Sequence, residues 1–73
     1  MEIQNKILAL IDDLGYGKVE PSEEFSAIGF DSLDLVDLIM KIENEFKISI
    51  PDEDTFGLKT VSDAVELVKN KTK

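Results

Sequence analysis

Apolar residues recur at helical spacing in three segments of this 73-residue chain, and this periodicity constrains the fold more than any other feature. In residues 2–14 they stand at i, i+4, i+7, i+8 and i+11, and they are Ile3, Ile7, Leu10, Ile11 and Leu14. Gly15 then follows as a natural end of the helix. A second helical segment runs from Ser32 to Phe46, and a third begins near Thr60. Because one face of each segment is apolar, the segments are expected to pack against one another.

The connections between these segments predict a small helical bundle. Residues 15–31 hold three of the four glycines and one of the two prolines, which indicates a long loop. Apolar side chains are expected to pin this loop to the core, namely Val19, Phe25, Ile28 and Phe30. Residues 48–50 suggest a short extended link, and Pro51 suits the first turn of a brief helix through residues 52–54. We therefore expect one domain over residues 1–73, an all-α bundle of three longer helices and one short helix.

Two helix starts carry capping signals. Asp31 or Ser32 is placed to cap the second helix by accepting a hydrogen bond from an unpaired backbone N–H group. Thr60 and Asp63 have the spacing of a capping box at the last helix. These signals predict where both helices begin.

Composition excludes several classes of protein. The chain has 16 acidic residues against 8 basic ones, for a net charge of −8, so it is a poor ligand for nucleic acid or for an anionic membrane. It contains no cysteine and no histidine, so it lacks a thiolate nucleophile and the usual side chain for proton transfer near neutral pH. No apolar run is long enough to span a membrane. We expect a soluble cytoplasmic protein that is not an enzyme.

The acidic charge is concentrated in the middle of the chain. Residues 31–54 carry eight acidic and two basic residues, a net charge of −6. Such a segment forms either a solvated face or an electrostatic docking surface for basic partners. Repulsion among these carboxylates is also expected to raise the pKa of some of them.

The second helix has two apolar sides. At 100° per residue, one arc of 100° forms a core face and holds Leu35, Leu38, Ile39, Ile42 and Phe46. A separate stripe lies on another side and holds Leu33, Val36 and Met40, with Asp37 and Glu43 on its flanks. This second stripe either docks a partner or is buried because the helix is central in the bundle.

The segment Gly29-Phe30-Asp31-Ser32-Leu33-Asp34, followed by Glu43-Asn44-Glu45-Phe46 and Ile50-Pro51-Asp52-Glu53, resembles the acyl carrier proteins. The similarity covers roughly residues 28–69, and the spacing of the whole run makes it specific. The fold of that family is a four-helix bundle, in agreement with the periodicity.

The resemblance implies that Ser32 carries 4′-phosphopantetheine, donated by coenzyme A and attached by a phosphopantetheinyl transferase. The thiol of this arm carries acyl groups as thioesters. Implied partners are acyl transferases, ketosynthases or acyl ligases, which the carrier would meet as a monomer. The family positions that face such enzymes match Asp31, Leu33, Asp34, Val36, Asp37, Met40 and Glu43. By the same resemblance Ile50 lies near the pocket that shelters an acyl chain, although it is equally an ordinary core residue.

Three departures from the family pattern leave the pathway open between fatty acid synthesis and a specialised lipid or polyketide route. The first loop is short, Phe56-Gly57 replaces a polar pair, and Lys41 interrupts the acidic helix. Two other functions are considered. One is an acidic interaction module without a prosthetic group. The other is a calcium loop over residues 52–63, which lacks a side-chain oxygen at Phe56 and has Asp63 in place of the usual glutamate.

Overall fold

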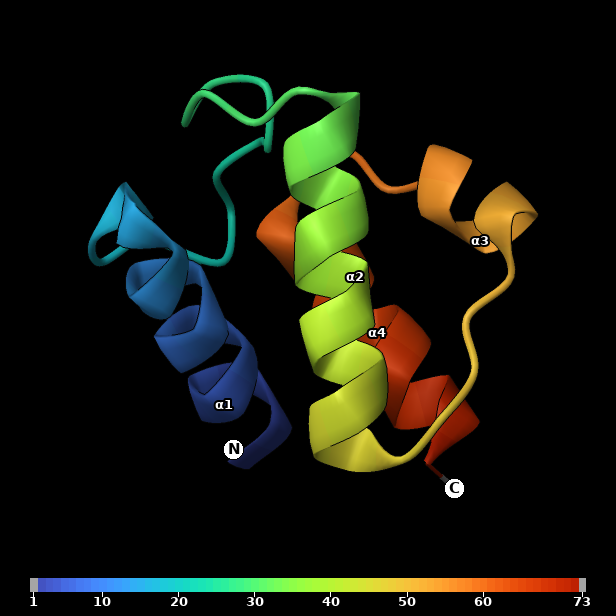
Figure 1. Cartoon of the computed structure of the whole chain (residues 1–73). Coiled ribbons are helices and arrows are strands. Elements are labelled where there is room, and N and C mark those ends of the chain that lie inside the picture. The colour runs from blue at the N-terminus through green and yellow to red at the C-terminus, as the bar shows by residue number, and fades with distance from the viewer. Residues whose placement is uncertain (1, 73) are drawn as a thin grey trace.

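The computed structural model of the chain describes residues 2–72. Its helices are α1 (Glu2–Ile11), α2 (Ser32–Phe46), α3 (Asp52–Phe56) and α4 (Val61–Lys71). Figure 1 shows α1 and α2 next to each other, α4 behind α2, and the short α3 on the side of α2 away from α1. The predicted all-α bundle of three longer helices and one short helix is confirmed.

The core lies where α1, α2 and α4 meet. Its fully buried large side chains are contributed in pairs by these helices, and they are Ile7, Ile11, Leu38, Ile42, Val61 and Val68. Burial of each such side chain contributes about 1.5–3 kcal/mol. The predicted stripes therefore form this core together with a partly buried margin, which holds Ile3, Leu10, Leu14, Leu35 and Phe46.

The first helix ends differently from the prediction for residues 2–14. α1 stops at Ile11, and a π-helical turn, η1 (Asp12–Tyr16), continues the chain. Gly15 lies inside this turn with φ of 99°, a conformation that residues with a Cβ rarely adopt. The turn moves the chain from the helix axis toward the long loop and directs Tyr16 toward α2.

The long loop is fixed to the start of α4 by backbone hydrogen bonds. The Phe25 N–H donates to the Lys59 carbonyl at 2.9 Å, and the Val61 N–H donates to the Glu23 carbonyl at 3.0 Å. These bonds surround an isolated antiparallel bridge between Glu24 and Thr60. The loop is thus held at its middle, and the predicted anchor Phe25 is buried beside it.

The end of the chain from α3 onward matches most of the sequence prediction. Thr60 and Asp63 form the expected capping box, with the Asp63 N–H donating to Thr60 Oγ1 at 3.1 Å. Asp52 and Asp54 lie within α3, and the Asp63 carboxylate accepts from the backbone of Lys59 and Thr60. Asp63, the last position of the calcium-loop alternative, is therefore occupied with backbone N–H groups, and residues 2–72 hold no cluster of three acidic side chains spaced to bind a metal ion. None of the helices described between residues 2 and 72 has the length and apolar character that crossing a bilayer requires.

Candidate functional site

Ser32 is exposed at the first position of α2, directly after the residue that caps the helix. The cap is Asp31, which decides between the two predicted candidates. Asp31 Oδ1 accepts from the Asp34 N–H at 2.9 Å, and Asp34 Oδ2 accepts from the Asp31 N–H at 3.2 Å. This reciprocal capping box rigidly defines the backbone on both sides of Ser32.

The surroundings of Ser32 suit a phosphodiester. The first backbone bond after the cap runs from the Leu35 N–H to the Asp31 carbonyl, so the Ser32 and Leu33 N–H groups precede the helical ladder. N–H groups at a helix N-terminus, together with the helix dipole, favour an anion there. The Ser32 hydroxyl is not needed as a cap, so it is available for esterification. The residues present therefore fit 4′-phosphopantetheine.

Aromatic packing supports the Asp31–Ser32 segment from below. The Tyr16 ring stacks on Phe30 with ring centroids 4.3 Å apart, and Phe25 packs on the same Phe30 at 5.2 Å. Phe30 is buried and immediately precedes Asp31. The loop, the π-helical turn and α2 are thereby joined at the residue before the capping box.

Asp34 is also linked to the π-helical turn. A backbone hydrogen bond from Asp31 and a side-chain hydrogen bond with Tyr16 lower the pKa of the Asp34 carboxyl from its ordinary value of 3.8. Partial burial, the hydrogen bond with Asp34 and nearby acidic charge together raise the pKa of Tyr16. The increase in pKa expected for some carboxylates of residues 31–54 does not occur at Asp34, because hydrogen bonds to its charged carboxylate outweigh the effect of its partial burial.

The second apolar stripe of α2 is exposed, which excludes the alternative that this side of the helix is buried in the bundle. Leu33 is 75% exposed, Met40 57% and Val36 45%, whereas Leu38 and Ile42 on the other side are fully buried. Exposed apolar side chains of this size, in one row and starting next to Ser32, form a surface suited to contact with another protein. Asp31 and Asp37 are exposed on the same helix, and Asp34 is half-buried.

Glu43 differs from the other acidic residues predicted for docking. Its carboxylate turns toward the link before α3, where Glu43 Oε2 accepts from the Ile50 N–H at 2.7 Å. Glu43 is half-buried, and Ile50 is only 6% exposed. The Glu43 side chain therefore fixes the link between α2 and α3 within the fold.

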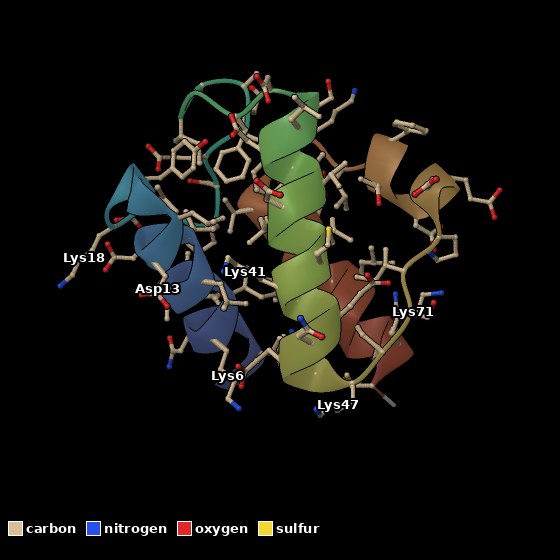
Figure 2. All side chains as sticks on the ribbon, in the orientation of Figure 1. Lys6, Asp13, Lys18, Lys41, Lys47 and Lys71 are labelled. Carbon is tan, nitrogen blue, oxygen red and sulfur yellow. The ribbon has the colours of Figure 1, made fainter. Side chains whose placement is uncertain are left out.

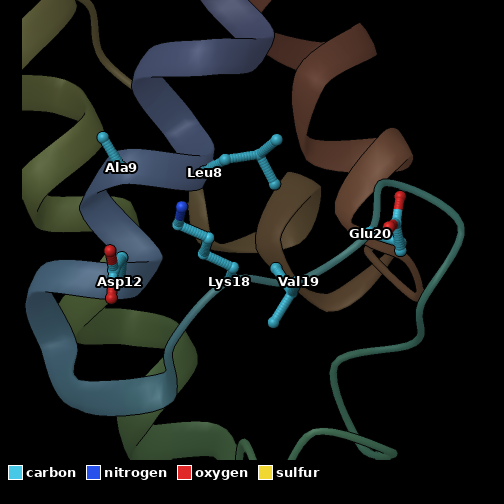
Figure 3. A pocket seen from close by; sticks show the side chains of 6 residues that line it. All are labelled: Leu8, Ala9, Asp12, Lys18, Val19 and Glu20. Atoms are coloured by element: carbon cyan, nitrogen blue, oxygen red, sulfur yellow. The ribbon is translucent and has the colours of Figure 1, made fainter.

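The surface of the bundle includes two pockets beside α1 and α2. The larger, of about 420 Å³, lies between α1 and the start of the long loop, where Figure 3 shows Leu8, Ala9, Asp12, Lys18, Val19 and Glu20. The second, of about 370 Å³, lies between the π-helical turn and α2. Ile50, predicted near an acyl pocket, lines neither of these two pockets.

Sequence reasoning missed Tyr16. The available signal was an aromatic residue directly after Gly15, and the structure shows it half-buried. The partner in space, Phe30, was predicted only as a general anchor of the loop. The separation of the two rings in sequence gave no periodicity from which their stacking could be read.

Comparison with known proteins gives consistent results. Residues 6–68 match the family described as "Phosphopantetheine attachment site". An acyl carrier protein of Chlorobium phaeovibrioides is 42% identical, over 96% of this chain and 95% of that protein. "Acyl carrier protein 3, chloroplastic" of Cuphea lanceolata is 43% identical, over 93% of this chain and 46% of that protein. The crystal structure of an acyl carrier protein from Thermotoga maritima superposes with a TM-score of 0.85 at 29% identity, over 96% of this chain and 86% of that one.

The family match covers most of the chain, and the Chlorobium relative is similar over nearly its whole length. The bundle, the exposed serine at the start of α2 and the capping box around it are in keeping with both. The chain belongs to the phosphopantetheine attachment site family, among the acyl carrier proteins.

Proposed function

We propose that this chain, as one carrier domain over residues 1–73, carries acyl intermediates as thioesters on a 4′-phosphopantetheine arm attached to Ser32 Oγ. The observation that carries the proposal is the exposed Ser32 hydroxyl at the first position of α2, beside N–H groups that precede the helical ladder. When bound, the prosthetic group supplies a terminal thiol that forms the thioester. Attachment moves the phosphopantetheinyl group of coenzyme A to Ser32 Oγ, which loses its proton, and releases adenosine 3′,5′-bisphosphate.

The chain itself positions Ser32 for the reaction and does not catalyse it. It has no histidine or cysteine to activate Ser32, so a phosphopantetheinyl transferase must act on it. The Asp31–Asp34 box and the Phe30 stack hold the serine in one place on the surface. We place this carrier in the cytoplasm, in acyl-chain synthesis of the fatty acid type or a related specialised route.

Partner enzymes are proposed to dock on the exposed stripe Leu33–Val36–Met40. Asp31, Asp34 and Asp37 would steer basic enzyme surfaces toward Ser32, chiefly by raising the association rate. Glu43 is included in this face by resemblance, but its contact with the Ile50 N–H supports a role in the fold first. Acyl transferases, ketosynthases and acyl ligases are the classes of partner that this carrier chemistry requires.

Ile50 is proposed to line the bottom of a site between α2 and the link to α3, where an acyl chain would be sheltered from solvent. The support is its burial and its position on a short link, where its N–H donates a hydrogen bond to the Glu43 carboxylate. A small outward movement of such a link opens apolar space without unfolding a helix. Attachment of a long acyl chain should therefore shift the Ile50 methyl resonances more than attachment of an acetyl group.

The proposed function is tested by intact-mass analysis after incubation with coenzyme A and a broad-specificity phosphopantetheinyl transferase. The chain is expected to gain one phosphopantetheine, and Ser32→Ala is expected to gain none. Ser26→Ala is the matched control, because Ser26 is exposed in the long loop and lies outside the motif. A wild-type chain that stays unmodified while a known carrier is loaded would favour the alternative, an interaction module without a prosthetic group.

A further inference from the structure

The second pocket continues the docking stripe around α2 toward α1. It has a volume of about 370 Å³, and its lining residues are Leu14, Asp37, Met40, Lys41 and Asn44. Met40 belongs both to this pocket and to the exposed stripe. We call this pocket the Lys41 groove. Leu14 and Met40 give it an apolar part, while Asp37 and Lys41 give it one charge of each sign.

The Lys41 groove lies within reach of a protein bound at Ser32. At about 1.5 Å per residue, Asp37 to Asn44 lie about 8 to 18 Å along the helix axis from Ser32. A protein interface of ordinary size covers about 800 Å² on each partner, which corresponds to a patch about 30 Å across. An enzyme that covers Ser32, Val36 and Met40 therefore reaches the edge of this groove, because Met40 lines both the stripe and the groove. This step rests on the proposed function.

Lys41 is the unusual member of the groove. Within the described residues, the ion pairs are Lys6 with Glu45 at 3.2 Å and Lys71 with Asp54 at 3.4 Å, so the Lys41 ammonium is in neither. Glu45, one turn after Lys41 on α2, is thus already engaged by α1. Figure 2 shows Lys41 on the side of α2 toward α1, whereas Lys47 lies at the far end of the helix.

The charge of Lys41 restricts which enzyme surface fits. A uniformly basic surface would pair with Asp34 and Asp37 but would place a positive charge against the Lys41 ammonium. Like charges brought together in an interface are unfavourable, so this mismatch discriminates between partners. A carboxylate opposite Lys41 removes the mismatch, and an apolar side chain beside it buries the exposed surface of Met40.

We propose that the phosphopantetheinyl transferase of the organism that encodes this chain fills the Lys41 groove with an apolar side chain flanked by a carboxylate. The apolar side chain packs on Leu14 and Met40, and the carboxylate pairs with the Lys41 ammonium. Lys41 is then a specificity-determining residue within an otherwise acidic docking helix.

The test compares Lys41→Glu with Lys47→Glu, using that organism's own transferase and coenzyme A. Both substitutions change the net charge by two units, but Lys47 is exposed outside the groove, directly after the end of α2. General attraction to a basic enzyme would make both variants load faster. The proposal instead predicts that Lys41→Glu lowers kcat/KM for loading by about tenfold or more, while Lys47→Glu equals or exceeds wild type.

Lys41→Met provides the second measurement, because it removes the charge but keeps a long apolar side chain. It is expected to fall between wild type and Lys41→Glu, so the result stands even if Lys41→Glu melts at a lower temperature. Equal rates for the two glutamate variants, or faster loading of Lys41→Glu, would overturn the proposal. Failure of the proposed function is a separate result, namely no loading of the wild-type chain by a broad-specificity transferase.

Discussion

The Glu43 carboxylate accepts a hydrogen bond of 2.7 Å from the backbone N–H of Ile50, seven residues further along the chain. This bond joins the last turn of α2 to the residue before Pro51, where the chain has no regular secondary structure. Glu43, which the sequence resemblance placed on the docking face, thus stabilises the link that leads into α3. Its half-buried position makes the bond stronger than a fully solvated one.

Removal of this carboxylate should destabilise the fold. Glu43→Ala leaves the N–H of the buried Ile50 without its acceptor and is expected to lower the free energy of unfolding by about 1–2 kcal/mol. Glu43→Gln retains an acceptor oxygen and should cost less. Urea denaturation measures both, with Asp37→Ala as the control on the exposed side of the same helix. Equal midpoints for Glu43→Ala and Asp37→Ala would show that the bond contributes nothing to stability.

Substitution of Asp31 should lower the stability of the fold, whereas substitution of Ser32 should remove the modification site without lowering stability. Asp31→Ala removes the side-chain cap of α2 and is expected to cost about 1 kcal/mol. Ser32→Ala replaces an exposed first helical residue that caps nothing, so its melting temperature should stay close to that of wild type. Thermal melts followed by circular dichroism compare the two. A larger loss for Ser32→Ala than for Asp31→Ala would mean that the cap is assigned to the wrong residue.

Tyr16 should influence Asp34 through its hydroxyl and Phe30 through its ring. Tyr16→Phe keeps the stacked ring and removes the hydrogen bond to Asp34, so the pKa of Asp34 should rise toward its ordinary value. Tyr16→Leu also removes the aromatic pair, which should cost about 0.5–1.5 kcal/mol more. Carboxyl carbon resonances titrated by NMR give the pKa, and chemical denaturation gives the stability. An unchanged pKa of Asp34 in Tyr16→Phe would contradict the link.

Acid should weaken the fold through the two capping carboxylates. Hydrogen bonds from Asp31 and Tyr16 lower the pKa of Asp34, and those from Thr60 and Lys59 lower the pKa of Asp63. A group with a lowered folded-state pKa stabilises the fold above its unfolded pKa, and this contribution is lost as pH falls through the folded pKa. Stability should therefore decline below about pH 4.

The variants Asp34→Asn and Asp63→Asn test this pH dependence. Each removes one titrating carboxylate, so each should flatten the decline of stability between about pH 5 and pH 2. Asp37→Asn, on the exposed side of α2, is the matched control. A steeper decline in either capping variant than in the control would reverse the assigned sign.

The sequence predicts the helices of this fold well where apolar and polar residues repeat with helical spacing. Angular position on α2 separates the side that holds Leu38 from the side that holds Met40, but only the packing of α1 and α4 decides that the Met40 side stays exposed. The box at Thr60 and Asp63 was likewise predictable, because it depends on residues three apart. Local rules of this kind need no knowledge of the tertiary structure.

Contacts between distant segments were not predictable in this way. The π-helical turn places Tyr16 on Phe30, and the bridge at Glu24 holds the loop against Thr60. Both depend on where the loop lies relative to α2 and α4, which no single-segment pattern encodes. The same reason explains Glu43, whose angle on α2 suggested an outward position while its length allows it to reach the Ile50 N–H.

The central claim is that Ser32 is the attachment point of the prosthetic group, and fragmentation of the loaded protein by tandem mass spectrometry tests it most directly. The chain also contains Ser22, Ser26, Ser49 and Ser62, so the modified residue must be located rather than assumed. The account predicts one phosphopantetheine on the peptide that contains Asp31-Ser32-Leu33, with the mass increment on Ser32 and on no other serine. An increment on any other residue, or a loaded Ser32→Ala chain, would contradict it.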